Sequence, residues 1–166
     1  MNDLQLRAWF YDRLQTTLVA AGVDPSQISE QGMPFNTVKY EATSSAFTGN
    51  PDNTAASSDW DDSKDYWVPY VLPNEPKAAA LGTGARNEYT GAFQVTLYGS
   101  ILHGEGELEH IAKMLPVTEA FKRGVTFSMV DQFCVYCNQS YIAYSGRDKD
   151  RWQIVARVKF RATIIN

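Results

Sequence analysis

The last stretch of the chain alternates between apolar and polar side chains, and this pattern constrains the fold more than any other. Apolar residues occupy every second position: Trp152, Ile154, Ala156, Val158, Phe160, Ala162 and Ile164. The positions between them are dominated by Gln153, Arg157, Lys159, Arg161 and Thr163. Because successive residues of a strand point to opposite faces, the pattern predicts a long strand with one buried face. Such a sheet must be covered on its apolar face.

Further strands are predicted upstream of this one. In residues 92–98 the same period of two places Phe93, Val95 and Leu97 on one face, after a glycine-punctuated polar turn at 82–91. Residues 67–72 form a predicted strand that Pro69 assigns to a sheet edge, because proline lacks the donor for a central ladder. Strands are also predicted for residues 125–129 and 135–144, with a polar turn at 145–150 joining the arms of the final hairpin.

Two helices complete the predicted fold. Leu6, Phe10, Leu14 and Leu18 recur every four residues and Ala21 extends the stripe, so we expect a helix over residues 3–21 that ends at Gly22. A second helix is predicted from Gly104 to Gly124, with Pro116 kinking or dividing it, acids in its first turn and basic residues in its last. Its expected apolar contacts are Leu108, Ile111, Leu115 and Phe121. The order of elements predicts an α+β fold, with a mostly antiparallel sheet packed by two helices on one face.

Length and composition limit the remaining possibilities. The 166 residues form one predicted domain over residues 1–166, in which 41–65 is a long acidic surface loop. Six acids lie in this loop beside one lysine, Lys64: Glu41, Asp52, Asp59, Asp61, Asp62 and Asp65. A net charge of −4 argues against a protein that grips nucleic acid by neutralising phosphates. No stretch approaches the roughly 18 apolar residues of a membrane span, so we expect a soluble protein made in the cytoplasm.

No group of side chains predicts catalysis, a cofactor or a metal. Cys134 and Cys137 are expected on opposite faces of a strand, as reduced structural thiols. His103 and His110 are interpreted as exposed residues in the first turns of a helix. The Gly82-Thr83-Gly84 turn lacks the third glycine of a dinucleotide fingerprint. We therefore do not expect an enzyme.

An ordered set of short motifs resembles the tail terminator (tail completion) proteins of long-tailed bacteriophages. The set begins with Met33-Pro34-Phe35 after the first helix and the strand 67–73. It continues with a Gly-x-Gly stretch containing Arg86 and ending in Tyr89-Thr90-Gly91, followed by a strand. A helix closing on Phe121-Lys122-Arg123-Gly124 and a strand with Trp152 complete it. The segment between Tyr40 and Tyr66 departs from the family by being longer and more acidic.

The resemblance implies a virion protein at the junction of tail and neck. It implies a ring, six-fold in the family, that caps the tail tube, stops its polymerisation and joins the head. The implied partners are further copies of the chain, the tail tube protein and a head–tail connector protein, with DNA passing through the lumen without sequence-specific binding. Another neck or connector component is the alternative from the same class. A small ligand-binding domain or enzyme is the alternative from a different class.

Charge asymmetry suggests how copies could meet. Acids of the 41–65 loop face a set of basic residues around the final hairpin, which allows head-to-tail pairing of subunits. The other interpretation is that both sets are merely solvated. The interface candidates are Arg86, Tyr89, Asp59, Asp61, Asp62, Arg147, Lys149, Arg151, Arg157, Lys159 and Arg161.

Overall fold

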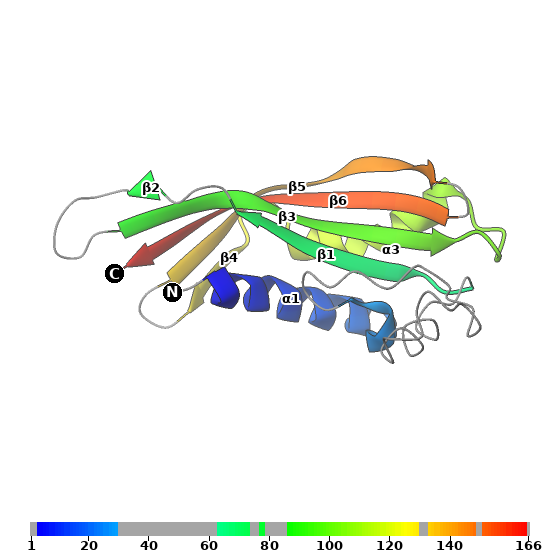
Figure 1. Ribbon diagram of the computed structural model, residues 1–166, viewed down its shortest axis with the longest axis horizontal. Helices are drawn as coiled ribbons and strands as arrows, with labels where there is room; N and C mark the ends of the chain where they lie inside the picture. Colours follow the sequence, from blue (N-terminus) through cyan, green and yellow to red (C-terminus); the bar gives the residue numbers. More distant parts are fainter. Residues whose placement is uncertain are drawn as a thin grey trace, which may run out of the picture.

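The computed structural model of the chain describes residues 3–29, 63–73, 77–78, 86–129, 133–148 and 151–165. Figure 1 shows a long twisted sheet with a helix lying along it. The elements follow in the order α1 (Asp3–Ala20), a short 3₁₀ helix (Pro25–Gln27), β1 (Tyr66–Pro73), β2 (Lys77–Ala78), β3 (Arg86–Ser100), α3 (Glu107–Ala120), β4 (Thr126–Met129), β5 (Phe133–Asp148) and β6 (Arg151–Ile165). The α+β class predicted from the sequence is confirmed.

Within the described residues the sheet is six-stranded and its strands pair antiparallel, while Ile28 adds an isolated parallel bridge to Trp67. Its order is β1-β3-β6-β5-β4, with the short β2 also paired to β3. The strand that contains Pro69 lies at the edge of this order, as its missing donor predicts. β3 and β6 form the centre and pair along their whole lengths, from Arg86 opposite Ile165 to Ser100 opposite Arg151.

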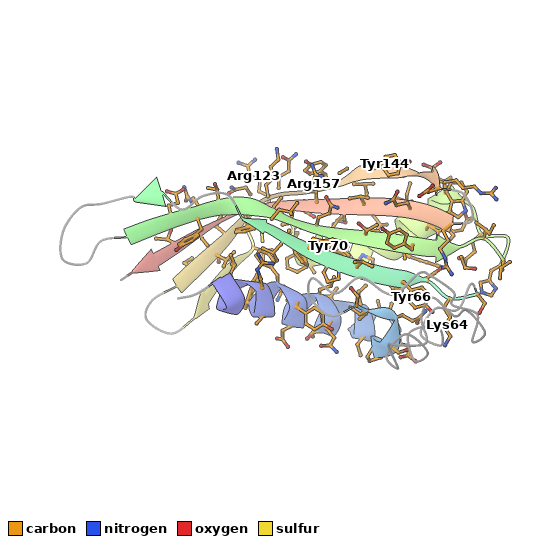
Figure 2. The ribbon with its side chains drawn as sticks, in the orientation of Figure 1. Lys64, Tyr66, Tyr70, Arg123, Tyr144 and Arg157 are labelled. Carbon is orange, nitrogen blue, oxygen red and sulfur yellow. The ribbon has the colours of Figure 1, made fainter. Side chains whose placement is uncertain are left out.

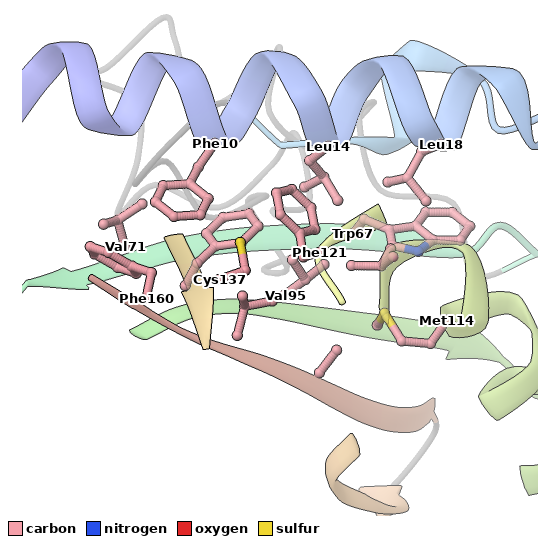
Figure 3. Close-up of a cluster of buried hydrophobic side chains, with 14 of the residues drawn as sticks. Phe10, Leu14, Leu18, Trp67, Val71, Val95, Met114, Phe121, Cys137 and Phe160 are labelled. Carbon is pink, nitrogen blue, oxygen red and sulfur yellow. The ribbon is translucent and has the colours of Figure 1, made fainter. Parts of the chain in front are cut away.

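α1 packs through the predicted stripe. Leu6, Phe10, Leu14 and Leu18 are at most 2% exposed, and Figure 3 shows the last three pointing from the helix toward the sheet. Burying each such side chain contributes about 1.5–3 kcal/mol, so this face is what holds the helix in place. Ala21, expected to extend the stripe, is exposed, because the helix ends at Ala20 and the chain turns at Gly22 with a φ of 88°.

The buried face of α3 differs from the predicted one. Leu108 is 78% exposed and Leu115 is 52% exposed. The fully buried positions are instead His110, Met114, Val117 and, just after the helix, Phe121. Apolar residues lie around most of α3, and the stripe chosen from the sequence is rotated by about one residue, roughly 100°, from the one that the sheet selects. Phe121 belongs to both stripes, and Ile111, which was also predicted as a contact, is partly buried against the core.

The ends of α3 also depart from the prediction. The helix is continuous from Glu107 to Ala120, so Pro116 does not divide it. Lys122 and Arg123 lie beyond its end and do not occupy its last turn. Its final carbonyl region is instead contacted from α1, where Nε and Nη2 of Arg13 both donate to the carbonyl oxygen of Ala120 at 3.3 Å. This contact joins the two helices.

Both helices share one core, which places them on the same face of the sheet. The core contains Phe93, Val95 and Leu97 of β3 together with the apolar side of β6, from Ile154 to Ala162. The ring of Phe10 stacks on that of Phe93 with centroids 4.7 Å apart, and Phe121 approaches Phe93 at 5.3 Å. The prediction of two helices on one face is therefore confirmed.

Two predicted turns are partly strand. β3 already begins at Arg86, so residues 86–91 belong to the strand and not to the turn before it. β5 continues to Asp148 and takes in most of the predicted 145–150 turn.

Of the predicted 41–65 loop, only residues 63–65 are described, and the rest lies outside the described residues. Within the described part of the chain, no helix has the length and apolar character needed to cross a membrane.

Candidate functional site

The face of the sheet opposite the helices carries a row of basic side chains on β6. Arg157, Lys159 and Arg161 alternate with the core residues Val158 and Phe160, so all three project to the face that no described helix covers. We call these three residues the basic stripe. Figure 2 labels Arg157 on this face together with Tyr70 of β1 and Tyr144 of β5.

Each member of the stripe is held differently. Nη2 of Arg157 donates to Oε1 of Gln94 at 2.8 Å, while its buried Nε has no hydrogen-bond partner. The ammonium of Lys159 lies 5.8 Å from the ring centroid of Tyr141. Nε of Arg161 is 3.8 Å from Oε1 of Glu88, and this pair is largely exposed. Within the described residues, no carboxylate forms an ion pair with Arg157 or Lys159, so two positive charges are left without a neutralising group there.

Apolar surface and a shallow depression accompany the stripe. Leu72 on the edge strand is 50% exposed and Tyr144 is 49% exposed. A depression of about 470 Å³ runs between Leu72, Arg157 and Lys159, with Gly91 and Asn138 also in its lining. Exposed apolar groups rimmed by polar residues, with arginine among them, are a feature of protein–protein contact surfaces.

The other half of this face is closed. Tyr66, Val68, Thr96 and Val155 are all at most 8% exposed, although no described helix covers them. Arg151 lies over this half: its guanidinium is 5.5 Å from the ring centroid of Tyr66. Tyr144 of β5 pairs with Val155 and is still 49% exposed, so the closed positions of this half are those on β1, β3 and β6.

The other predicted interface residues whose side chains are described, Arg151, Tyr89 and Arg147, are not part of this surface. Arg151 is 8% exposed and its Nη1 donates to the carbonyl of Lys64 at 2.6 Å, so its contacts lie within the chain. Tyr89 is half-buried against the core, on the helix side. Arg147 is exposed on the last residues of β5. Arg86 begins β3, but its side chain is outside the described part of the chain, as are Asp59, Asp61, Asp62 and Lys149.

The two cysteines are free thiols on opposite faces, as predicted. Cys134 is exposed, whereas Cys137 is buried. Burial raises the pKa of the Cys137 thiol to about 11, which keeps it protonated and unreactive near neutral pH. Because the two sulfur atoms face opposite sides of β5, they do not form a shared metal or redox site.

A polar cluster that sequence reasoning missed lies where β1 begins and β3 ends. Asp65, Glu105 and His110 bring one carboxylate or imidazole atom each within 4.8 Å of one another. Lys113 joins them, with its ammonium 2.5 Å from Oδ2 of Asp65 and also bonded to Glu105. Burial lowers the pKa of Lys113, but the hydrogen bonds to the two carboxylates outweigh it, so the pKa is raised overall.

Two residues of this cluster were interpreted differently from the sequence. His110, predicted to be exposed in the first turns of a helix, is fully buried. Asp65, predicted to be one of the solvated loop acids, has a side chain that is 11% exposed. The signal that could have found the cluster is the spacing of His110 and Lys113, which places both on one face of a helix that begins with acids.

Comparisons with known proteins bear on the fold only. No family model matches the chain, and no curated protein matches it. Eleven chains of solved structures do match. One of them superposes with a TM-score of 0.57 at 15% sequence identity, and the match covers 100% of this chain and 96% of that chain. The shared arrangement therefore extends over the whole domain, and at this identity the likeness is one of fold.

Proposed function

We propose that this chain is a structural protein of a phage virion that resembles tail terminators. Copies of it form a ring that caps the finished tail tube, stops tube polymerisation and provides the surface that joins the head. The observation that carries the proposal is the basic stripe of Arg157, Lys159 and Arg161, on a sheet face that no described helix covers. The ordered set of sequence motifs, from Met33-Pro34-Phe35 to Trp152, supports the same assignment.

The stripe suits head-to-tail pairing of subunits. The sequence carries six acids within 41–65, of which Asp65 is bound to Lys113 within the chain, and the stripe carries three positive charges. The five other acids and the stripe give each copy both halves of a complementary contact. A contact between two different surfaces of the same chain closes into a ring when its rotation permits, and otherwise extends as a filament. Charge complementarity fixes partner and orientation, while exposed apolar groups such as Leu72 and Tyr144 contribute burial.

Capping needs no chemical step. A tail tube grows because each added subunit presents the same contact again. A ring that matches the tube end but offers a different outer surface removes that contact, and growth stops. The other surface of the ring is then available to the head–tail connector. With a net charge of −4, the chain lets DNA pass through the lumen without gripping it.

Deletion of the gene from its phage tests the proposal. Without the cap we expect filled heads without attached tails, together with tails of abnormal and variable length, while capsid assembly proceeds normally. Electron microscopy of the lysate measures both. Tails of normal length that remain unjoined to heads would favour a connector role instead, and a fully infectious deletion phage would refute both structural roles.

A further inference from the structure

The strand-end cluster assembles four side chains from three separate segments. Asp65 immediately precedes β1, and Glu105 lies in the turn between β3 and α3. His110 and Lys113 are one helical turn apart on α3. Their contacts close the end of the sheet at which these segments meet. This end lies away from the basic stripe.

The imidazole of His110 points an electron pair into this cluster. Its Nδ1 lies 2.8 Å from the carbonyl oxygen of Gly106, which can only accept, so Nδ1 carries the hydrogen. In the neutral ring Nε2 is then an acceptor. Nε2 is buried and has no hydrogen-bond partner, and it lies 3.5 Å from Oε2 of Glu105 and 3.7 Å from Oδ1 of Asp65. Three acceptor atoms therefore converge on one point, an arrangement that a cation stabilises.

Surrounding groups position the residues that carry these acceptors. The backbone N–H of Ser100 donates to Oδ1 of Asp65 at 2.7 Å. The indole Nε1 of Trp152 donates to the backbone carbonyl oxygen of Glu105 at 3.1 Å, which positions the main chain of this residue. The absent side chain of Gly99 leaves the space that the imidazole occupies: a Cβ there would lie 2.2 Å from Nε2. The bond to Gly106 sets the tautomer of His110 and the bond from Ser100 orients the Asp65 carboxylate, and supporting bonds of this kind are typical of metal sites.

We propose that Asp65, Glu105 and His110 bind a divalent transition-metal ion of the zinc class. Ligand atoms about 2.1 Å from a tetrahedral ion stand roughly 3.4 Å apart. The distances from Nε2 to the two carboxylates, 3.5 and 3.7 Å, are close to this value, and all three ligand atoms lie within 4.8 Å of one another. One imidazole and two carboxylates suit Zn²⁺ better than Mg²⁺ or Ca²⁺, which prefer oxygen ligands alone.

Lys113 is the competitor for this position. Its ammonium contacts both carboxylates and supplies the positive charge between them. The side chain is 31% exposed, so it can turn to solvent when a metal ion enters. The bound ion would tie the start of β1, the turn after β3 and α3 together, and would fasten this end of the sheet.

Calorimetric titration of the metal-stripped full chain with Zn²⁺ tests the proposal. We expect one ion per chain, with affinity reduced by roughly tenfold or more in Glu105→Gln and raised by roughly tenfold in Lys113→Met, the range in which groups around a metal usually act. Glu119→Gln and Lys122→Met are matched controls, because they make the same changes in an exposed pair on or just beyond the same helix. Both should bind as the wild type does. Circular dichroism of each variant without metal verifies that it is folded.

X-ray absorption at the zinc edge identifies the ligands independently. A shell of nitrogen and oxygen atoms supports the proposal, whereas sulfur ligands would assign the ion to the exposed thiol of Cys134 and overturn it. Absence of saturable binding in both the wild type and Lys113→Met also overturns it. A Zn²⁺ affinity that is unchanged in Glu105→Gln also overturns the proposal, since the cluster would then bind only the ammonium group of Lys113.

Discussion

Gly99 is placed where no other residue fits. It ends the inner face of β3, and a Cβ at this position would lie 1.9 Å from Cδ2 of His110. Gly99→Ala must therefore displace a fully buried imidazole, and we expect it to destabilise the fold by about 1–3 kcal/mol, as overpacked core positions do. Urea unfolding measures the loss. Gly106→Ala is the control, because its Cβ would meet only a carboxylate oxygen of Glu109 at 3.0 Å. A loss no larger than that of the control would contradict this packing.

The two thiols should differ sharply in reactivity. Cys134 is exposed, while Cys137 is buried and has a pKa raised to about 11. Near pH 8 an aromatic disulfide reagent should modify one thiol of the native chain quickly and the second only after unfolding. Absorbance of the released thiolate counts them, and Cys134→Ser should abolish the fast reaction. Rapid modification of both thiols in the native chain would show that Cys137 is not enclosed.

Single residues with polar side chains were the hardest to place from the sequence. The alternation of β3 and β6 predicted which apolar residues are buried, because a period of two is read directly from neighbouring positions. His110 and Asp65 gave no comparable signal. The burial of His110 depends on the space that Gly99 leaves on β3, and that of Asp65 depends on the charge of Lys113. Neither contact produces a periodic pattern in the sequence.

α1 is attached mainly by its apolar stripe, which gives a direct test of how it is docked. Leu14 is fully buried, so Leu14→Asp places an unpaired charge between helix and sheet and should cost several kcal/mol. Leu108→Asp makes the same change on α3 at a position that is 78% exposed, and should leave the melting temperature nearly unchanged. Thermal unfolding followed by circular dichroism measures both. Equal melting temperatures would mean that α1 is not docked in the free chain.

α3 explains why an element can be predicted while its orientation is not. Its existence followed from the acidic start, and its apolar content was recognised correctly. Apolar residues occur on several sides of it, however, and two stripes of similar strength compete: one through Leu108 and Leu115, the other through Met114 and Val117. The choice is made by the surface that receives the helix, where Arg13 of α1 bonds to Ala120. That surface is assembled from distant parts of the chain.

The arrangement of charge across the domain is also only partly visible in the sequence. Six basic residues near the final hairpin were grouped as one candidate surface, and the fold separates those that the structure describes. Arg157, Lys159 and Arg161 share one face because they alternate on a single strand. Arg151, on the same strand, covers Tyr66 and bonds to Lys64 within the chain. Alternation predicts the face of the sheet on which a residue lies. It does not predict whether the charge of that residue already interacts with another group of the same chain.

The proposed ring makes this charge arrangement testable. Reversing Arg157 and Arg161 to glutamate replaces attraction with repulsion toward the acids of a neighbouring copy, and we expect weaker assembly at low salt. The difference from the wild type should narrow as salt is added, because salt screens both the attraction and the repulsion. Lys122→Glu with Arg123→Glu is the matched control, since it reverses two charges on exposed residues beyond α3. Because Arg157 also bonds to Gln94, the melting temperature of each variant must first be compared with that of the wild type.

Native mass spectrometry and imaging of capped tail tubes then report assembly. The proposed ring, which resembles that of tail terminators, should give six-fold density at the tube end for the wild type and the control. This density should be lost in the Arg157/Arg161 variant. A monomer in free solution is compatible with this mechanism, because docking on the tube end can supply the remaining contacts that close the ring. A symmetry other than six-fold at this position would refute the ring. Tubes capped equally well by the reversed variant would instead move the subunit contact away from the basic stripe, since a heterologous contact that includes these charges cannot survive their reversal.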